Sequence, residues 1–277
     1  MPRSQGEDQE RNARMPDTHM LSSVRSRVSP LEWQARLDCA ALYRLMAHFG
    51  QTDLIFNHIT LRVPGEGNRI LINPYGWMYE EITASSLVTI DLNGNEVLNP
   101  HGPDASVNFA GYVIHSAIHG ARDDVACVIH THTRAGMAVA SMKCGFLPMT
   151  QTAIGCFPVA YHDYEGPAVD VAERERLVDH LGSANFLVLR NHGLLVCNKT
   201  AAGAFRSIHQ FEAACQAQVD AMPRGGASGE MPLLVPETIV AASVERRRIA
   251  MAKRPSVELH WPAMLRLLDR RDPSWRD

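Results

Sequence analysis

Two histidines stand one residue apart directly after an apolar stretch: His130 and His132 follow residues 127–129. Alternate side chains of a strand point to the same face, so both imidazoles would project together and could reach one cation. A catalytic metal site of this kind needs at least a third protein ligand. We expect this ligand to be His192, because it also follows an apolar run and precedes Gly193, which allows a tight backbone conformation beside a site.

Three neutral imidazoles around one cation would leave a coordination position open, as in a Lewis-acid site. The alternative is that the pair arose by chance, since the chain contains 13 histidines and an isolated H-x-H motif is a weak signal. The second motif, N-H-G at residues 191–193, favours metal binding. The ligand types do not select the metal, because imidazoles bind several first-row cations.

Changes of hydrophobic period along the chain predict the elements that position these histidines. A helix begins at Pro30 after the cap residue Ser29 and ends at Gly50. The further expected elements are hairpins that turn at residues 65–68 and 93–94, helices at 109–121, 133–143 and 200–222, and strands at 125–133, 157–164 and 185–197. Strands and helices alternate irregularly, which predicts the α/β class in the α+β sense, a mixed sheet with helices packed on its faces.

The composition is typical of a soluble globular protein. The chain has 277 residues, a formal net charge of −3 and 45% hydrophobic residues. No apolar run approaches the length of about eighteen residues that a membrane span needs. The chain also lacks the excess of basic residues that is typical of nucleic-acid-binding proteins. The six cysteines are scattered and form no C-x-x-C pair, which is typical of a reducing compartment. We therefore expect a cytoplasmic protein with neither a membrane nor a nucleic-acid partner.

Three segments are expected along the chain. Residues 1–27 are polar and contain no apolar segment of the kind that a secretory signal needs, so we expect a disordered arm. Residues 28–222 contain the predicted elements and are expected to form one domain. Residues 223–277 begin with a Gly/Pro-rich linker and continue as a partly helical, basic tail.

The motifs between Ile55 and about Val219 resemble the class II aldolase and adducin family, through FNHITLR, ILINPYG, ITASSLVTIDLNG, ARDDVACVIHTHT and LRNHG. NHIT, TASSLV, HSAIH and RNHGLL are most similar to the adducin head domain and its bacterial relatives. The resemblance implies an αβα layered fold with a central mixed or antiparallel sheet, assembled as a homotetramer. It also implies one divalent metal ion per subunit on His130, His132 and His192, commonly zinc, with iron, manganese and nickel as alternatives.

The chain departs from the family enzymes that cleave or epimerise sugar phosphates. These enzymes carry an acid/base carboxylate four residues before the histidine that corresponds to His115, and this chain has Gly111 there. Their phosphate-binding turns keep only Asn57 and Gly76 here, while the hydroxyl side chains are lost. A phosphate dianion needs convergent N–H and O–H donors or cations, so we expect a substrate other than a sugar phosphate. The expected substrate-binding residues are Asn57, His58 and Gly76.

Histidines are the first candidates for an acid or base in place of the missing carboxylate, because an imidazole titrates near neutrality. His58, His115 and His119 all stand within the matched motifs. His115 and His119 share a helical face, being four residues apart. We select His115, with a buried structural histidine as the alternative, and we expect His119 at the surface.

Two tyrosines and one carboxylate complete the candidate site. Tyr161 and Tyr164 stand in one loop-like stretch, and we select Tyr161 as a proton donor, with a surface residue as the alternative. Glu212 lies on the long predicted helix and could orient a metal-bound histidine. The alternative for Glu212 is a solvated helix residue.

Two functions of different classes follow. The first is a divalent-metal-dependent lyase that breaks a C–C bond of a small hydroxy-carbonyl or carboxylate substrate, by aldol cleavage or decarboxylation. The glycine at position 111 favours decarboxylation, because that reaction needs no base to remove a hydroxyl proton. The second is a non-catalytic, adducin-like module for oligomerisation and interaction.

Overall fold

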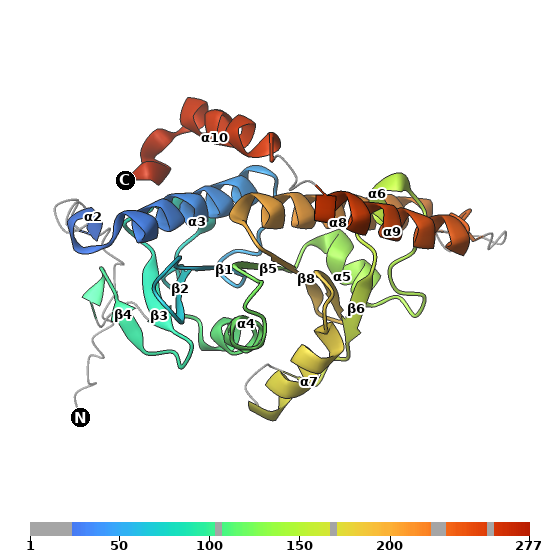
Figure 1. Cartoon of the computed structure of the whole chain (residues 1–277), viewed down its shortest axis with the longest axis horizontal. Coiled ribbons are helices and arrows are strands. Elements are labelled where there is room, and N and C mark those ends of the chain that lie inside the picture. Colours follow the sequence, from blue (N-terminus) through green and yellow to red (C-terminus); the bar gives the residue numbers. More distant parts are fainter. Residues whose placement is uncertain (1–23, 103–106, 167–170, 223–230, 254–257) are drawn as a thin grey trace, which may run out of the picture.

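A single sheet crosses the described part of the chain, which comprises residues 24–102, 107–166, 171–222, 231–253 and 258–277 of the computed structural model (Figure 1). Its eight strands follow the order β4-β3-β2-β1-β5-β8-β7-β6. The strands are β1 (His58–Arg62), β2 (Arg69–Ile72), β3 (Val88–Asp91), β4 (Glu96–Leu98), β5 (Cys127–Thr131), β6 (Val159–His162), β7 (Phe186–Leu189) and β8 (Gly193–Asn198). Only β6 and β7 pair in parallel among these strands. The predicted mixed sheet is confirmed.

Helices cover both faces of the sheet, which gives the predicted αβα layers (Figure 1). The first face carries α3 (Pro30–His48), α5 (Arg134–Ala140) and α8 (Ala201–Ala221), and the second carries α4 (Phe109–Ala121) and α7 (Val171–Leu181). The remaining helical segments are α2 (Val24–Arg27), η1 (Tyr79–Glu81), α6 (Gln151–Ile154), α9 (Glu237–Lys253), α10 (His260–Arg271) and η3 (Pro273–Arg276). No described helix is long and apolar enough to cross a membrane.

The alternation of side chains along β1 and β5 decides which residues face α4. Ile59 and Ile129 enter the core beneath α3 and α8. The neighbour of each isoleucine along its strand points to the opposite face. There His58 of β1 is paired in register with His130 of β5. The second face of the sheet therefore presents imidazoles to α4 at its centre, where an apolar surface would be usual.

The predicted start of the first long helix is confirmed. Ser29 precedes Pro30, and its hydroxyl oxygen accepts a hydrogen bond from the backbone N–H of Glu32 at 3.0 Å. Gly50 follows the helix with a φ of 65°, a conformation that glycine adopts without steric cost. The hairpin pairings of β1 with β2 and of β3 with β4 also agree with the sequence.

The prediction of one strand over residues 185–197 is wrong. The stretch forms β7 and β8, which pair antiparallel and are joined by a turn at residues 190–192. Asn191 has a φ of 57°, which asparagine tolerates better than most residues, and this reverses the chain. The helix α7 was not predicted, although Leu177 and Leu181 bury one side of it against the sheet.

The end of the chain packs against the first face. Helix α10 contacts α3, and Trp275 is 1% exposed within the core beneath α3. The backbone N–H of Ala84 donates to the carbonyl oxygen of Trp275 at 3.0 Å. Most of the expected arm and part of the linker lie outside the described residues, and the division at residue 222 stays a prediction.

Candidate metal centre

The three histidines singled out from the sequence meet at one point. His130 is the penultimate residue of β5, His132 follows the end of that strand, and His192 lies in the turn between β7 and β8. The Nε2 atom of His132 is 2.8 Å from Nε2 of His130 and 2.9 Å from Nε2 of His192. The three atoms all lie within 4.8 Å of one another, so this group could hold a metal ion.

In two of these rings the Nδ1 nitrogen already donates a hydrogen bond to a protein acceptor. Nδ1–H of His130 donates to the carbonyl of Leu194 at 2.9 Å, and Nδ1–H of His132 donates to Oδ2 of Asp53 at 3.1 Å. A neutral imidazole carries one N–H, so both rings present bare Nε2 lone pairs to each other. Two lone pairs at this distance repel, and a cation between them removes the repulsion. The donor set therefore fits a divalent ion.

Burial favours the neutral, metal-binding form of two of the ligands, His130 and His192. It lowers the pKa of His130 well below the ordinary value, and it lowers the pKa of His192 to about 4, with the neighbouring His132 contributing. Metal binding requires unprotonated imidazoles, so no proton has to be displaced from these two rings at neutral pH.

Glycine at position 193 permits the approach of the two segments that carry the ligands. A Cβ atom there would lie 2.2 Å from the carbonyl oxygen of Thr131, which is far inside van der Waals contact. The first residue of β8 thus packs directly on the last residue of β5, and His192 is held beside His132. The expectation that Gly193 serves close backbone packing agrees with this contact.

The predicted orienting carboxylate does not touch a candidate ligand. Glu212 is 4% exposed and accepts hydrogen bonds from the hydroxyl of Thr133 and from Nε2 of Gln216. Since Thr133 caps α5, Glu212 fixes the start of that helix one residue after His132. Asp53 makes the direct contact, and sequence reasoning missed it because it lies 79 residues away in a loop.

A cavity of about 380 Å³ opens beside the three Nε2 atoms. It is lined by Phe56, His58, Asn108, Gly111, Ile114, His130, His132, Met137, Tyr164, Gly166, Asn191 and His192. None of these described lining residues is a lysine or an arginine. The cavity thus offers metal-binding nitrogens and apolar walls, without the cations that hold a phosphate dianion.

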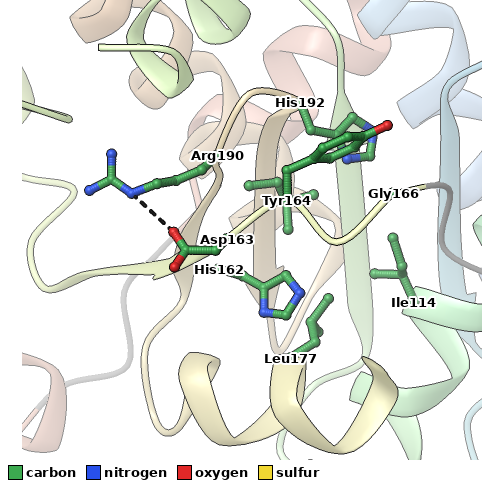
Figure 2. A pocket seen from close by; sticks show the side chains of 9 residues that line it. Ile114, His162, Asp163, Tyr164, Gly166, Leu177, Arg190 and His192 are labelled. Atoms are coloured by element: carbon green, nitrogen blue, oxygen red, sulfur yellow. Dashed lines mark ion pairs between the residues drawn. The ribbon is translucent and has the colours of Figure 1, made fainter. Parts of the chain in front are cut away.

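The two tyrosines of the 157–164 stretch lie in different surroundings. Tyr161 belongs to β6, its hydroxyl oxygen accepts the N–H of Phe146 at 3.0 Å, and it does not line the cavity. Tyr164 lies beyond the end of the strand and does line it, with its ring centroid 6.3 Å from that of His192 (Figure 2). Figure 2 draws an adjoining pocket that shares Ile114, Tyr164, Gly166 and His192 with the cavity, and it shows His162 pointing toward Leu177 of α7, away from His192. Tyr164 is thus the better placed proton donor.

The space at the expected carboxylate position is filled by another residue. A Cβ atom on Gly111 would lie 2.3 Å from Cδ2 of His58, whose ring lines the cavity. Burial, with smaller contributions from His132 and His192, lowers the pKa of His58 to about 3. A neutral imidazole therefore stands where the resemblance would place an acid.

The other expected residues lie deeper or elsewhere. His115 is completely buried, and His119, expected at the surface, is 1% exposed because α4 turns its face toward the sheet. Asn57 is 1% exposed, and neither atom of its amide finds a partner among the described residues. Asn57 and Gly76 do not line the cavity, so their expected substrate contacts stay predictions.

The chain is similar to known proteins along most of its length. The family model described as Class II Aldolase and Adducin N-terminal domain matches residues 37–219, which include the three histidines and the whole cavity lining. The chain belongs to this family. A Caulobacter vibrioides protein named "Putative aldolase class 2 protein" is 46% identical over 257 residues, covering 92% of this chain and 96% of the relative. Rat alpha-adducin is 43% identical over 209 residues, which are 75% of this chain and 28% of the adducin.

Solved structures of class II aldolase family proteins show the same architecture. An aldolase II superfamily protein from Pseudomonas syringae matches with a TM-score of 0.84 and 46% identity, over 92% of this chain and all of the other. An L-fuculose 1-phosphate aldolase from Glaciozyma antarctica matches with a TM-score of 0.73 over 89% of this chain and 93% of the other. At 21% identity, the second likeness concerns the fold alone.

Proposed function

We propose that this class II aldolase family member is a divalent-metal-dependent lyase that cleaves a C–C bond of a small hydroxy-carbonyl or carboxylate substrate. The supporting observation is the convergence of Nε2 atoms from His130, His132 and His192 beside an open cavity. When bound, a divalent ion, zinc in our proposal, supplies a Lewis acid that stabilises the negative charge which develops on a substrate oxygen as the bond breaks.

The chain's own residues hold and enclose the substrate. Phe56, Ile114 and Met137 form apolar walls around the cavity, which favours exclusion of water from the reacting atoms. Tyr164 lies beside His192 and brings a hydroxyl donor to the same space. The size of the cavity suits a small molecule, and its lining argues against a phosphate ester.

We base the proposed oligomeric state, substrate size and location on the family resemblance. We take the active form to be a homo-oligomer, a tetramer by resemblance, that acts on a small molecule in the cytoplasm. Aldol cleavage and decarboxylation both remain within the proposal, and the glycine at position 111 favours the second.

A second candidate function is a non-catalytic, adducin-like interaction module. The 43% identity with alpha-adducin favours it, as does the lack of a carboxylate at Gly111. The Nδ1 contacts of His130 and His132 favour the enzyme, because they direct the Nε2 lone pairs of both rings toward the cavity, which an interaction module does not need.

Metal analysis tests the proposal. The protein is purified without chelators, incubated with zinc, desalted and measured by elemental analysis, in parallel with a His130→Ala/His132→Ala variant. We expect about one zinc per subunit in the parent and less than about 0.1 in the variant, since two of three ligands are lost. A His48→Ala variant, altered on α3 outside the cavity, should retain the metal of the parent.

Two results would turn the assignment toward the interaction module. One is a parent that retains no zinc, iron, manganese or nickel after incubation with each. The other is a double variant that retains as much metal as the parent. With metal present, a screen of hydroxy-acids and keto-acids then asks which substrates lose carbon dioxide or an aldehyde.

A further inference from the structure

A second pocket lies at the end of the β7–β8 hairpin that is opposite to the metal centre. It has a volume of about 300 Å³, and its lining includes Phe186, the first residue of β7, and Asn198, the last residue of β8. His192 lies in the turn that joins the other ends of these strands. A strand rises about 3.3 Å per residue, so the length of β8 separates the two sites by roughly 20 Å.

Two arginines give this pocket a positive charge, and we name it the arginine pocket. Arg206 of α8 and Arg247 of α9 both line it, and none of its described lining residues is acidic. Neither arginine forms an ion pair with a carboxylate of the described chain. Burial lowers the pKa of Arg247, and the charge of Arg206 acts in the same direction. An anion in the pocket would offset the repulsion between the two charges.

Backbone carbonyls hold the guanidinium of Arg247 in place without neutralising it. Its two terminal nitrogens donate to the carbonyl oxygens of Gly155 and Phe157, in the segment before β6. A guanidinium has five N–H groups, so further donors remain for another acceptor. A carbonyl carries no net charge, and the positive charge of Arg247 therefore stays uncompensated at a fixed position.

The two neighbours of Arg247 on α9 do not line the arginine pocket. Nε of Arg246 donates to the carbonyl of Ala242 within the same helix at 3.3 Å, and Arg248 pairs with Glu245 at 2.8 Å. The run of basic residues at 246–248 thus contributes one charge to the pocket. Arg246, which has the same side chain one position away, offers a matched control.

Neutral donors and an apolar side complete the arginine pocket. The hydroxyl oxygen of Ser207 accepts from Nδ2 of Asn198 at 3.3 Å, so its own hydrogen can be donated to another acceptor. Ser183 is exposed and adds a second hydroxyl. Phe157 and Pro158 line the pocket beside these groups. This combination suits a ligand with a charged head and an apolar body.

We propose that the arginine pocket binds a phosphate monoester of a small organic group, with the phosphate held by the two arginines and the organic group packed against Phe157. The planar fork of a guanidinium pairs with two phosphate oxygens at once, and the hydroxyl groups supply further donors for a dianion. The inference does not depend on the proposed lyase, because the pocket contains none of the metal-binding histidines.

The alternative is that Arg247 serves to attach α9 to the segment before β6. This role accounts for the bonds to the two carbonyls. It leaves Arg206 without a function, however, and it predicts that an anion neither binds at the pocket nor depends on both arginines.

Calorimetric titration at constant ionic strength distinguishes the two accounts, with phenyl phosphate, inorganic phosphate and phenol as ligands. We expect the parent to bind phenyl phosphate at one site per chain, inorganic phosphate more weakly, and phenol without measurable heat. Arg206→Gln changes an exposed side chain that has no ion pair to lose, and Arg247→Gln changes the second arginine. Each should weaken the binding of phenyl phosphate about tenfold or more, because a charge-assisted hydrogen bond is lost.

Two controls fix where the phosphate binds. Arg246→Gln on α9 should bind phenyl phosphate like the parent, because Arg246 does not line the pocket. The His130→Ala/His132→Ala variant should also bind it like the parent, because these ligands lie at the other end of the hairpin.

A parent that does not bind phenyl phosphate overturns the proposal, and so does an Arg206→Gln protein, folded by circular dichroism, that keeps the parent's affinity. Equal weakening in Arg246→Gln would mean general attraction to a basic helix, which also overturns it. Binding lost in His130→Ala/His132→Ala would assign the phosphate to the metal centre instead. Inorganic phosphate that binds as tightly as phenyl phosphate ends the role of Phe157. A metal-free parent that still binds phenyl phosphate means that the proposed lyase fails while the arginine pocket stands.

Discussion

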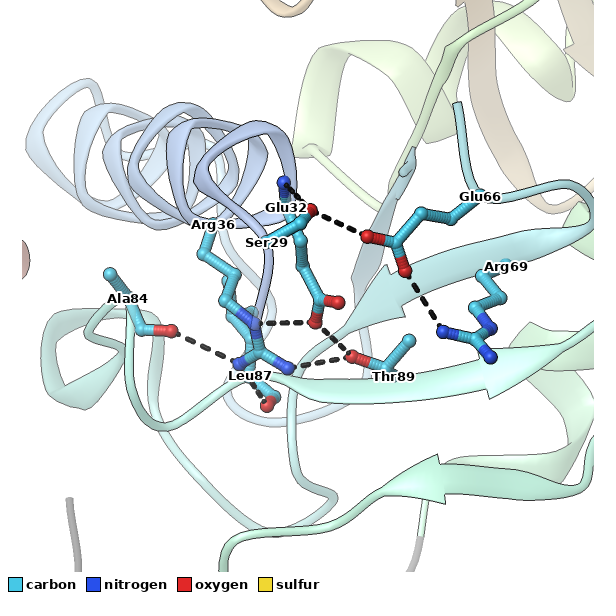
Figure 3. Close-up of polar contacts among 8 residues, drawn as sticks. All are labelled: Ser29, Glu32, Arg36, Glu66, Arg69, Ala84, Leu87 and Thr89. Atoms are coloured by element: carbon cyan, nitrogen blue, oxygen red, sulfur yellow. Dashed lines mark hydrogen bonds and ion pairs between the residues drawn. The ribbon is translucent and has the colours of Figure 1, made fainter. Parts of the chain in front are cut away.

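Two buried polar clusters on opposite faces of the sheet are built in opposite ways. In the first, the guanidinium of Arg36 donates to Glu32 at 2.9 Å, to the hydroxyl of Thr89 at 2.6 Å, and to two backbone carbonyls (Figure 3). Thr89 in turn donates to the same carboxylate oxygen of Glu32 at 2.8 Å. In the second, His130, His132 and His192 direct nitrogens at one another and into a cavity.

The difference separates a structural role from a functional one. The cluster of Glu32, Arg36 and Thr89 contains opposite charges and completes its own hydrogen bonds, so it needs nothing from outside the chain. The histidine cluster contains no opposite charge, its Nε2 atoms converge, and it becomes favourable when a cation joins it. We expect disruption of the first cluster to change folding and disruption of the second to change binding.

The largest effect on stability is expected at Arg36. In an Arg36→Met variant, Glu32 loses its buried charge partner, and breaking a buried pair in this way costs about 3–5 kcal/mol of the free energy of unfolding. Urea unfolding followed by circular dichroism measures it. Folded Arg36→Met protein should still retain zinc, and a variant that is as stable as the parent would contradict the structural role of this cluster.

Acidification should destabilise the metal-free protein through the buried ring of His119. The pKa of His119 is lowered to about 3 in the folded protein, whereas an unfolded histidine titrates near 6.5. Between these values the unfolded chain binds more protons, so stability falls as the pH falls through this window. His119 contributes about 1.4 kcal/mol for each pH unit within it.

Unfolding free energies at several pH values between 6.5 and 4 check this dependence. A His119→Leu variant should lose that part of the slope, while His260→Gln on α10 serves as the control on a different element. An unchanged slope in His119→Leu would mean that His119 titrates normally in the folded protein.

A methyl group at position 193 should damage the metal centre more than the fold. In Gly193→Ala, the new Cβ meets the carbonyl of Thr131 at 2.2 Å, so β8 must shift and move His192, at a cost of about 1–3 kcal/mol. We expect weaker zinc affinity by competition with a chelating dye. Gly120→Ala on α4, where no atom lies within 4 Å of the added Cβ, should bind zinc like the parent. Equal affinities of the two variants would contradict the close approach.

The smallest effect is expected at Asp53. Asp53→Asn weakens the acceptor that holds Nδ1–H of His132, and loss of such a partner lowers metal affinity by about 10- to 100-fold. The same dye competition measures it. Asp163→Asn is the control, because this carboxylate pairs with Arg190 and not with a ligand histidine. Unchanged affinity in Asp53→Asn would remove Asp53 from the site.

The sequence predicted the metal centre because its pattern is local. An H-x-H pair after an apolar run and an N-H-G turn are visible within a few residues each, and the strand pairing of β5 with β8 brings them together. The contact of Asp53 with His132 and the contact of His58 with His115 are not local, since they join segments far apart in the sequence. No spacing in the chain reveals those contacts.

The expectation that His119 lies at the surface is wrong, because helical spacing identifies a shared face but not which element covers it. The sequence also does not show where β6 ends. The strand stops at His162, which leaves Tyr161 packed beside Phe146 and Tyr164 in the loop at the cavity, so the role of Tyr161 stays a prediction. The resemblance identified Gly111 as a missing carboxylate, but only the structure shows that the ring of His58 occupies its place.

X-ray absorption at the zinc edge of the zinc-loaded protein tests whether the three histidines hold the ion and leave one position open. We expect scattering from three imidazoles with zinc–nitrogen distances of about 2.0–2.1 Å, and one further light ligand at the position left open to the cavity. A site with fewer than three imidazoles, or one in which a fourth protein side chain closes the coordination sphere, would contradict it.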